Sequence, residues 1–402
     1  MSSFLTKIQS LFTPEQAPQA PLDSPESAFA EWRSPRRGER NPEPMNNPFW
    51  SYAIREGCSA YKLNEHFSGP GSFDGDPGWC FDRFGRTKTK LPDGRKVFIG
   101  GEHEDYYDPD FYIYNDVVVQ DGDEFNIYGY PEADFPPTDF ATATLVGDAI
   151  YLIGNLGYPE DRKIGEIQVL RLDIKTWAMQ RLTTTGEKPG WLHKHKAQLS
   201  VDAAALRISG GQIFHEGGFE ENIDDYQLCL KTLAWTRVTD RQWQSWKIAR
   251  SDGNSLALWS LRLAATYRAM NQVNEPLKAL VGEISDRQVA LIEDLYLSPF
   301  GPEKARTREL LVSDDNDDDE EEEDEEFGDE EYNRYRLDIQ GVTVRFDEND
   351  QRIAIMIEGP LPTEIVSTLL TTVRDRLSEI VKAPCVLTRS KDSTAGGTPA
   401  IQ

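Results

Sequence analysis

A short apolar strand that ends in glycine returns three times along this chain at nearly constant spacing, and no other feature constrains the fold as much. The three copies are Val97–Gly101, Ile150–Asn155 and Leu206–Gly211, and their first glycines are 54 and 56 residues apart. Self-similarity at a fixed period is typical of repeat architectures, in which one repeat cannot bury its apolar face alone. Residues 84–238 are therefore predicted to form a series of stacked β repeats.

Each repeat contains four short strands. In the second repeat, Asp139–Thr144 precedes the glycine-ended strand, and Glu166–Leu172 and Trp177–Leu182 follow it. This pattern, with a glycine pair after the second strand and a tryptophan opening the fourth, resembles the kelch repeat of β-propellers. Glycine suits the point where crowded inner strands turn outward, and an indole can pack between neighbouring blades. The second repeat has Asn155 in place of its second glycine, and the first repeat lacks the tryptophan.

The predicted fold class is mainly β: a kelch-like β-propeller with few or partly degenerate blades, followed by helices and a small C-terminal α+β domain. Proline-rich composition near the N-terminus predicts disorder, and the hydrophobic period changes to that of helices after the repeats. The predicted domains are a disordered Pro-rich segment (1–46), the propeller region with an N-terminal cover segment (47–240), a helical segment packing on the propeller (241–312), an acidic low-complexity linker (313–332), a β-β-β-α-β domain (333–390) and a disordered tail (391–402).

The charge of the chain is strongly negative. It has 43 Lys and Arg against 69 Asp and Glu, a formal net charge of −26, and residues 314–331 alone hold 15 carboxylates. A general nucleic-acid binder needs a cationic footprint to displace counterions from phosphates, so this balance argues against nucleic acid as a partner. The acidic tract is predicted either to be an extended spacer or to capture a basic partner.

The location of the protein is predicted from what its sequence lacks. No apolar run approaches the length of a membrane span, so stable membrane insertion is not expected. Residues 1–12 have helical spacing without the apolar core of a secretory signal, which predicts a cytoplasmic protein. The four cysteines form no CxxC pair and predict neither a zinc site nor a disulfide framework.

Candidate binding residues lie in the loops that follow two of the glycine pairs. The first of these loops crowds one histidine and five carboxylates into a few positions, and the third repeat has a histidine and a glutamate in the equivalent loop. Loops held at one rim of a propeller can form a shared surface. The predicted partner-binding residues are Glu102, His103, Asp105, Tyr106, Tyr107 and Asp110 in the first repeat and His215, Glu216 and Phe219 in the third.

The predicted function is that of a non-catalytic scaffold that presents these rim loops to a protein partner. No catalytic residue and no cofactor is predicted, because no nucleophile–base arrangement and no Gly-rich phosphate loop has a supporting context. The alternative is a metal-dependent or carbohydrate-acting propeller enzyme that uses the same loops, since oxygen-rich loops can bind divalent cations. His193 and His195 permit a metal site on one side of a strand, or they have a structural role in packing.

Overall fold

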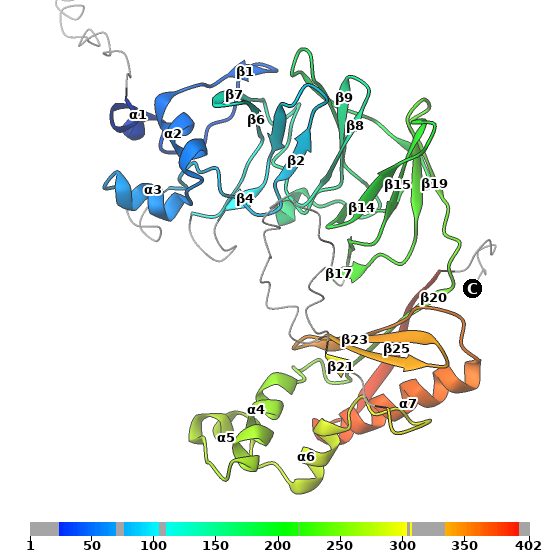
Figure 1. The fold of residues 1–402 in the computed structure, drawn as a ribbon. Helices are drawn as coiled ribbons and strands as arrows, with labels where there is room; N and C mark the ends of the chain where they lie inside the picture. Colours follow the sequence, from blue (N-terminus) through cyan, green and yellow to red (C-terminus); the bar gives the residue numbers. More distant parts are fainter. Residues whose placement is uncertain are drawn as a thin grey trace, which may run out of the picture. The chain divides into compact units, whose positions relative to one another are not determined.

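The computed structural model describes residues 24–69, 76–103, 110–216, 218–303, 306–307 and 334–393. The fold is mainly β, with several sheets and a set of helices (Figure 1). Two compact units are present. The first runs to Glu220 and takes in Leu228–Trp235, and the second contains Glu221–Gln227 and the chain from Thr236 onward.

Three sheets have the same design, in which the four strands of one repeat are neighbours in the order in which they occur in the chain. The first sheet contains β2 (Thr87–Lys90), β3 (Lys96–Ile99), β6 (Asp116–Asp121), β7 (Glu124–Gly129) and β1 (Glu43–Pro44). The second contains β8 (Thr142–Val146), β9 (Ala149–Ile153), β10 (Val169–Asp173) and β11 (Met179–Arg181). The third contains β14 (Lys196–Leu199), β15 (Ala205–Ser209), β18 (Tyr226–Cys229), β19 (Ala234–Arg237) and β12 (Thr185–Gly186). In each sheet the first strand of the repeat is a terminal strand, and we call β2, β8 and β14 the inner strands.

Glycine ends β3 and β9 because the next repeat crosses there at close range. A Cβ atom on Gly100 would lie 2.2 Å from the Thr138 carbonyl oxygen, and one on Gly154 would lie 2.4 Å from the Leu192 carbonyl oxygen. The following residues donate to the same two oxygens, with N–O distances of 2.8 Å from Gly101 and 2.9 Å from Asn155. Each glycine therefore allows one repeat to hydrogen-bond to the segment that leads into the next.

The three inner strands begin beside one another. Gly85, Phe140 and Lys194 come just before them, and all three have positive φ, at 60°, 46° and 52°. The Phe140 amide donates to the Gly85 carbonyl at 2.9 Å, and the Lys194 amide donates to the Phe140 carbonyl at 3.0 Å. We call this pair of hydrogen bonds the backbone seam. It joins equivalent positions of the three repeats, so the repeats seen in the sequence are repeats in space.

Trp177 packs in a core built from the first and second sheets. Its ring stacks on Tyr128 with centroids 5.9 Å apart, and its carbonyl accepts from the Tyr130 hydroxyl at 2.8 Å. In the third repeat the equivalent turn position is Leu233, which has φ 55° against 60° for Trp177. The tryptophan of the third repeat, Trp235, therefore lies two residues beyond the position equivalent to Trp177.

The chain before the repeats is ordered from residue 24, which corrects the predicted disorder of 1–46; residues 1–23 lie outside the described residues. Its helices are α1 (Pro25–Trp32), α2 (Pro48–Glu56) and α3 (Ala60–His66). The Trp50 indole donates to the Trp32 carbonyl at 2.7 Å, and Phe29 and Trp50 enter a core shared with the first sheet. A few large rings thus bury enough apolar surface to order a polar, proline-rich segment.

A six-stranded sheet forms the centre of the second unit. Its order is β21 (Arg306–Thr307), β22 (Arg334–Ile339), β23 (Val342–Glu348), β24 (Arg352–Ile357), β20 (Trp243–Arg250) and β25 (Cys385–Ser393). Its helices are α4 (Leu258–Ala269), α5 (Glu275–Val281), α6 (Asp286–Glu293) and α7 (Thr363–Ile380).

The second unit differs from its predicted boundaries. Residues 243–250 form a central strand, and the helices after them share the core of this sheet, where the sequence predicted a helical segment packing on the repeats. Residues 391–393 continue β25, where a disordered tail was predicted. The linker 313–332 and residues 394–402 lie outside the described residues, and within the described chain no helix is long and apolar enough to cross a membrane.

Candidate functional site

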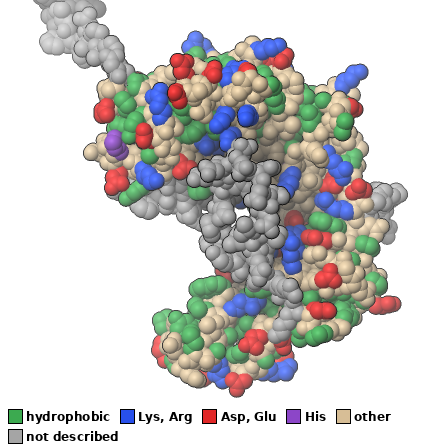
Figure 2. Space-filling view, in the orientation of Figure 1, with side chains coloured by type: hydrophobic (Ala, Val, Ile, Leu, Met, Phe, Trp, Pro, Cys, Tyr) green, Lys and Arg blue, Asp and Glu red, His purple; other side chains and the backbone are tan. Residues whose placement is uncertain are grey.

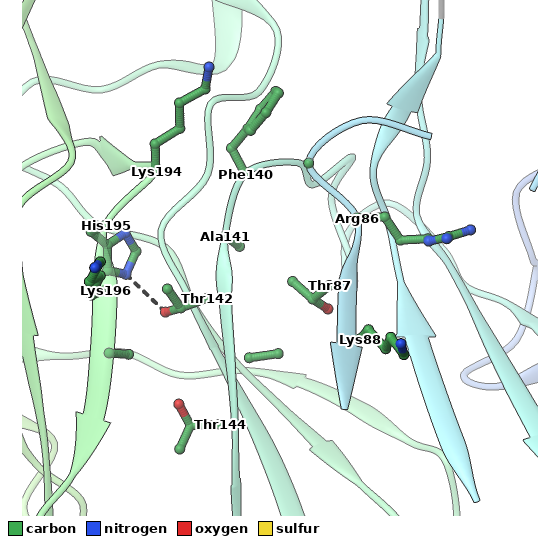
Figure 3. Close-up of a pocket in the computed structure, with 13 residues that line it drawn as sticks. Arg86, Thr87, Lys88, Phe140, Ala141, Thr142, Thr144, Lys194, His195 and Lys196 are labelled. Carbon is green, nitrogen blue, oxygen red and sulfur yellow. Dashed lines mark hydrogen bonds between the residues drawn. The ribbon is translucent and has the colours of Figure 1, made fainter. Parts of the chain in front are cut away.

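A pocket of about 500 Å³ lies where the three inner strands begin (Figure 3). The backbone seam brings these chain segments together, so residues more than 100 positions apart in the sequence line one space. We call it the basic pocket, and its lining residues are Gly85, Arg86, Thr87, Lys88, Phe140, Ala141, Thr142, Ala143, Thr144, Lys194, His195, Lys196 and Ala197.

The described lining of the basic pocket carries charge of one sign. Its thirteen residues include Arg86, Lys88, Lys194 and Lys196 and no carboxylate. Figure 2 shows Lys and Arg side chains gathered toward the middle of the first unit on the face drawn. The chain as a whole has a net charge of −26. A concave site that is lined by positive charges concentrates the electrostatic field there, and such a field attracts anions.

Aromatic rings position two of these cations. The Arg86 guanidinium lies 4.0 Å from the centroid of Phe81 and 4.9 Å from that of Phe98, and it donates to the Phe81 carbonyl. The Lys194 ammonium lies 4.5 Å from the Phe140 centroid. Cation–π contacts of this kind reduce the number of side-chain conformations of the cation. The rings therefore fix the positions of the Arg86 and Lys194 side chains.

The centre of the pocket is hydroxyl-rich. Thr87, Thr142 and Thr144 lie in the middle of Figure 3, with Lys196 on one side and Lys88 on the other. Threonine hydroxyls can donate to an anion or to a peptide carbonyl. The pocket thus combines hydrogen-bond donors at its floor with cations at its flanks.

His195 is a buried, neutral part of this floor. It is 5% exposed, and its Nε2 lies 2.9 Å from the Thr142 hydroxyl oxygen. Burial lowers the pKa of His195 to about 4, because an imidazolium would lose its hydration. Burial likewise lowers the pKa of His193 to about 3, and its ring packs edge-on against Phe219 with centroids 4.8 Å apart. Both histidines therefore pack and orient their neighbours.

The predicted metal arrangement finds no further ligands. Within the part of the chain that the structure describes, no group of three or more His, Cys, Asp or Glu side chains is placed to hold a metal ion. His193 and His195 are both buried, as the structural role considered for them from the sequence requires.

Two of the described residues predicted to bind a partner after the first glycine pair, His103 and Asp110, are buried. Glu102 and His103 form β4, which pairs with β5 (Tyr112–Ile113). His103 is 3% exposed and its Nδ1 lies 2.6 Å from the Tyr114 hydroxyl, while Asp110 is 2% exposed. Burial lowers the pKa of His103 to about 3. These two side chains do not have the exposure that the prediction requires, and Asp105, Tyr106 and Tyr107 lie outside the described residues.

The candidate residues of the third repeat belong to a different sheet, formed by β13 (Leu192–His193), β16 (Gln212–His215) and β17 (Gly218–Glu221). His215 ends β16, Glu216 is exposed in the turn, and Phe219 of β17 packs on His193 and lies 5.0 Å from the Arg162 guanidinium. Among the described candidates, Glu102 and His103 therefore lie in the β4–β5 sheet, and His215 and Phe219 lie in the β13–β16–β17 sheet.

The cations of the basic pocket were not predicted as a site. Their signal in the sequence is a local excess of basic residues just before and within the first strand of the first and third repeats, in an otherwise acidic chain. Neither run is basic enough to stand out alone, and only the backbone seam makes them neighbours.

The sequence of the chain matches no protein-family model, and no curated protein is significantly similar to it.

Proposed function

We propose that the first unit is a kelch-like, propeller-type module that binds a protein partner and does not catalyse a reaction. The observation that carries the proposal is the convergence of three equivalent inner strands on the basic pocket. Four-stranded antiparallel sheets that meet at their first strands are the design of propeller blades. Binding sites are commonly concave and largely pre-formed, with a few placed polar groups.

Binding fits the pocket better than catalysis does. A nucleophile–base pair made of Thr142 and His195 would need a third group to orient the imidazole and a pKa near neutrality. Among the described residues, His195 Nδ1 has no hydrogen-bond partner, and burial holds the pKa of His195 at about 4. The buried carboxyl of Asp139, which accepts from the Gly157 amide at 2.7 Å, is 0% exposed and out of reach of a substrate.

Site-specific photocrosslinking in cells tests this function. A photoreactive amino acid replaces Lys88, which lines the pocket, or Lys231, an exposed lysine of the same unit outside it. We expect a discrete protein adduct from position 88 and none from position 231. Adducts that are absent from position 88, or equal at both positions, would contradict the proposal.

Metal content discriminates the alternative function. Stoichiometric metal in the purified full chain, lost in the His103→Ala, His215→Ala variant, would favour the metal-dependent enzyme considered from the sequence. We expect no metal that depends on these residues, since His103 is buried against Tyr114.

A further inference from the structure

Helix α4 of the second unit is apolar on both of its faces. Leu258, Leu261 and Ala265 are buried in the core of this unit. On the opposite face Trp259 is 63% exposed, and Met270, directly after the helix, is 53% exposed. A surface helix normally presents charged or polar residues to the solvent, so this second apolar face marks a candidate interface.

The residues of the exposed face form one stripe along the helix. Trp259, Leu263, Thr266 and Met270 follow one another at spacings of four, three and four residues, which places them on the same side of a helix. The Met270 amide donates to the Thr266 carbonyl at 3.1 Å, so Met270 still follows the helical path. Alternate spacings of three and four residues are those of a coiled-coil seam, in which the side chains of two helices interlock. The stripe therefore has the spacing that packing against another helix requires.

The charges of α4 are already paired within the second unit. Its two charged residues are Arg262 and Arg268, which form ion pairs with Glu348 at 2.5 Å and with Asp286 at 2.7 Å. The Thr266 hydroxyl donates to the Arg262 carbonyl at 3.1 Å. Burial of the stripe would therefore leave none of these three side chains without a partner.

The order of residues in the stripe favours a second copy of this chain. The spacing reads the same in both directions, so a two-fold axis through the middle of the stripe superimposes the stripe on itself. Antiparallel pairing sets Trp259 of one copy against Met270 of the other, and Leu263 against Thr266. Tryptophan and methionine are enriched at interfaces, and a thioether packs favourably on an aromatic ring. We infer that α4 is the interface of a homodimer, in which the α4 helices of two copies pack antiparallel.

Helix α5 extends the apolar surface beside the stripe. It packs on α4 with Leu277 buried, while its Leu280 and, in the turn before it, Val273 are exposed. Figure 1 shows α4 and α5 at one end of the helices of the second unit, and Figure 2 shows hydrophobic side chains at that end. Two such helix pairs give four helices around one apolar seam, which is more contact area than two single helices provide.

Net charge gives this dimer a characteristic salt dependence. The chain has a net charge of −26, so two copies repel each other at low salt, and the interface itself adds no ion pair between copies. Salt screens that repulsion, and self-association should therefore become tighter as the salt concentration rises. A membrane surface is a less suitable occupant, because an interfacial helix attracts lipid headgroups through free cations, and both arginines of α4 are paired.

Sedimentation velocity of the full chain at about 1–100 µM measures self-association. The repulsive variant, Trp259→Glu, Met270→Glu, sets carboxylate against carboxylate across the axis. The matched control is Ile164→Glu, Val201→Glu, which replaces two exposed apolar residues of the first unit with the same charge change. The complementary variant, Trp259→Glu, Met270→Lys, sets Glu against Lys at both ends of an antiparallel pair, whereas a parallel pair would set like charges together.

We expect the wild type and the control to dimerise with dissociation constants within about twofold of each other, and the repulsive variant to bind about 100-fold more weakly. The complementary variant should recover at least about tenfold of that loss, and the wild type should dimerise more tightly at 0.5 M than at 0.05 M salt, both of them about the ends of the screening range. Thermal melting within about 2 °C of the wild type confirms that each variant folds. A wild type that stays monomeric over the whole range, equal losses in the repulsive and control variants, or no recovery in the complementary variant would overturn the inference.

Hydrogen–deuterium exchange of the wild type locates the interface without any substitution. We expect residues 258–281 to exchange more slowly at high than at low protein concentration, because the dimer shields α4 and α5. Concentration-dependent protection confined to other parts of the chain would contradict the assignment of the interface to α4.

Discussion

Replacement of Gly154 by alanine tests whether close crossing of consecutive repeats determines the fold of the first unit. Gly154 has φ 81°, and a Cβ atom there would lie 2.4 Å from the Leu192 carbonyl oxygen. The matched control is Gly165→Ala, where φ is 78° and no atom lies within 4 Å of the added Cβ. Both variants lose the conformational freedom of glycine, and only Gly154→Ala adds a clash with the backbone.

The expected magnitude follows from these two contributions. Left-handed backbone costs a non-glycine residue about 1–2 kcal/mol, which both variants share. In Gly154→Ala the Leu192 carbonyl must also move, which weakens the hydrogen bond that it accepts from the Asn155 amide, worth about 1 kcal/mol, and disturbs fully buried Leu192. We expect a loss of about 3 kcal/mol for Gly154→Ala, against about 1–2 kcal/mol for Gly165→Ala.

Differential scanning calorimetry measures the outcome. For a unit of this size, 3 kcal/mol corresponds to a fall in Tm of about 6–12 °C. The transition that moves in both variants belongs to the first unit, and the difference between the variants isolates the clash. Equal shifts for Gly154→Ala and Gly165→Ala would refute the argument that these glycines exist to admit the next repeat.

Three further predictions concern stability. The Arg83 guanidinium donates to the Asp116 carboxylate at 2.6 and 3.0 Å, and both side chains are buried. Arg83→Met removes the cation from this buried carboxylate, so we expect it to lower the free energy of unfolding in urea by about 3–5 kcal/mol. A loss below about 1 kcal/mol would contradict this expectation. In the folded chain His193 is neutral, because burial lowers its pKa to about 3. In the unfolded chain the imidazole takes up a proton below about pH 6.5. The free energy of unfolding should therefore fall as the pH drops from 7 to 5. His193→Phe should reduce that pH-dependent loss by about 1–2 kcal/mol, and an unchanged pH profile would show that His193 does not contribute. Deletion of residues 314–331 should change the Tm of the first unit by less than about 2 °C, and a larger loss would show that the tract packs against folded structure.

The regular part of the first unit could be predicted because its signals are local. The glycine-ended strands and their spacing lie within short stretches of sequence, and Gly100 and Gly154 do mark the points where repeats meet. The mainly β class was confirmed for the same reason. The identity of these repeats as propeller blades stays a proposal.

The features that the sequence did not reveal depend on residues far apart in the chain. Strand β20 owes its place to β24 and β25, which lie at least 100 residues further on, and its own pattern gave no clear period. Helix α1 was hidden in a proline-rich segment because Phe29 and Trp32 find their ring partners around Phe49 and Trp50. Exposure of a loop cannot be derived from its polarity, so His103 was expected at the surface although it is buried against Tyr114.

The backbone seam has a consequence for how this protein can change. Gly85, Phe140 and Lys194 are joined through amides and carbonyls, so the positions of the inner strands do not depend on which side chains line the basic pocket. Substitutions at Lys88 or Lys196 can therefore alter ligand choice without rebuilding the support beneath them. The lining side chains could therefore be replaced to select new binding specificities while the backbone that carries them stays unchanged.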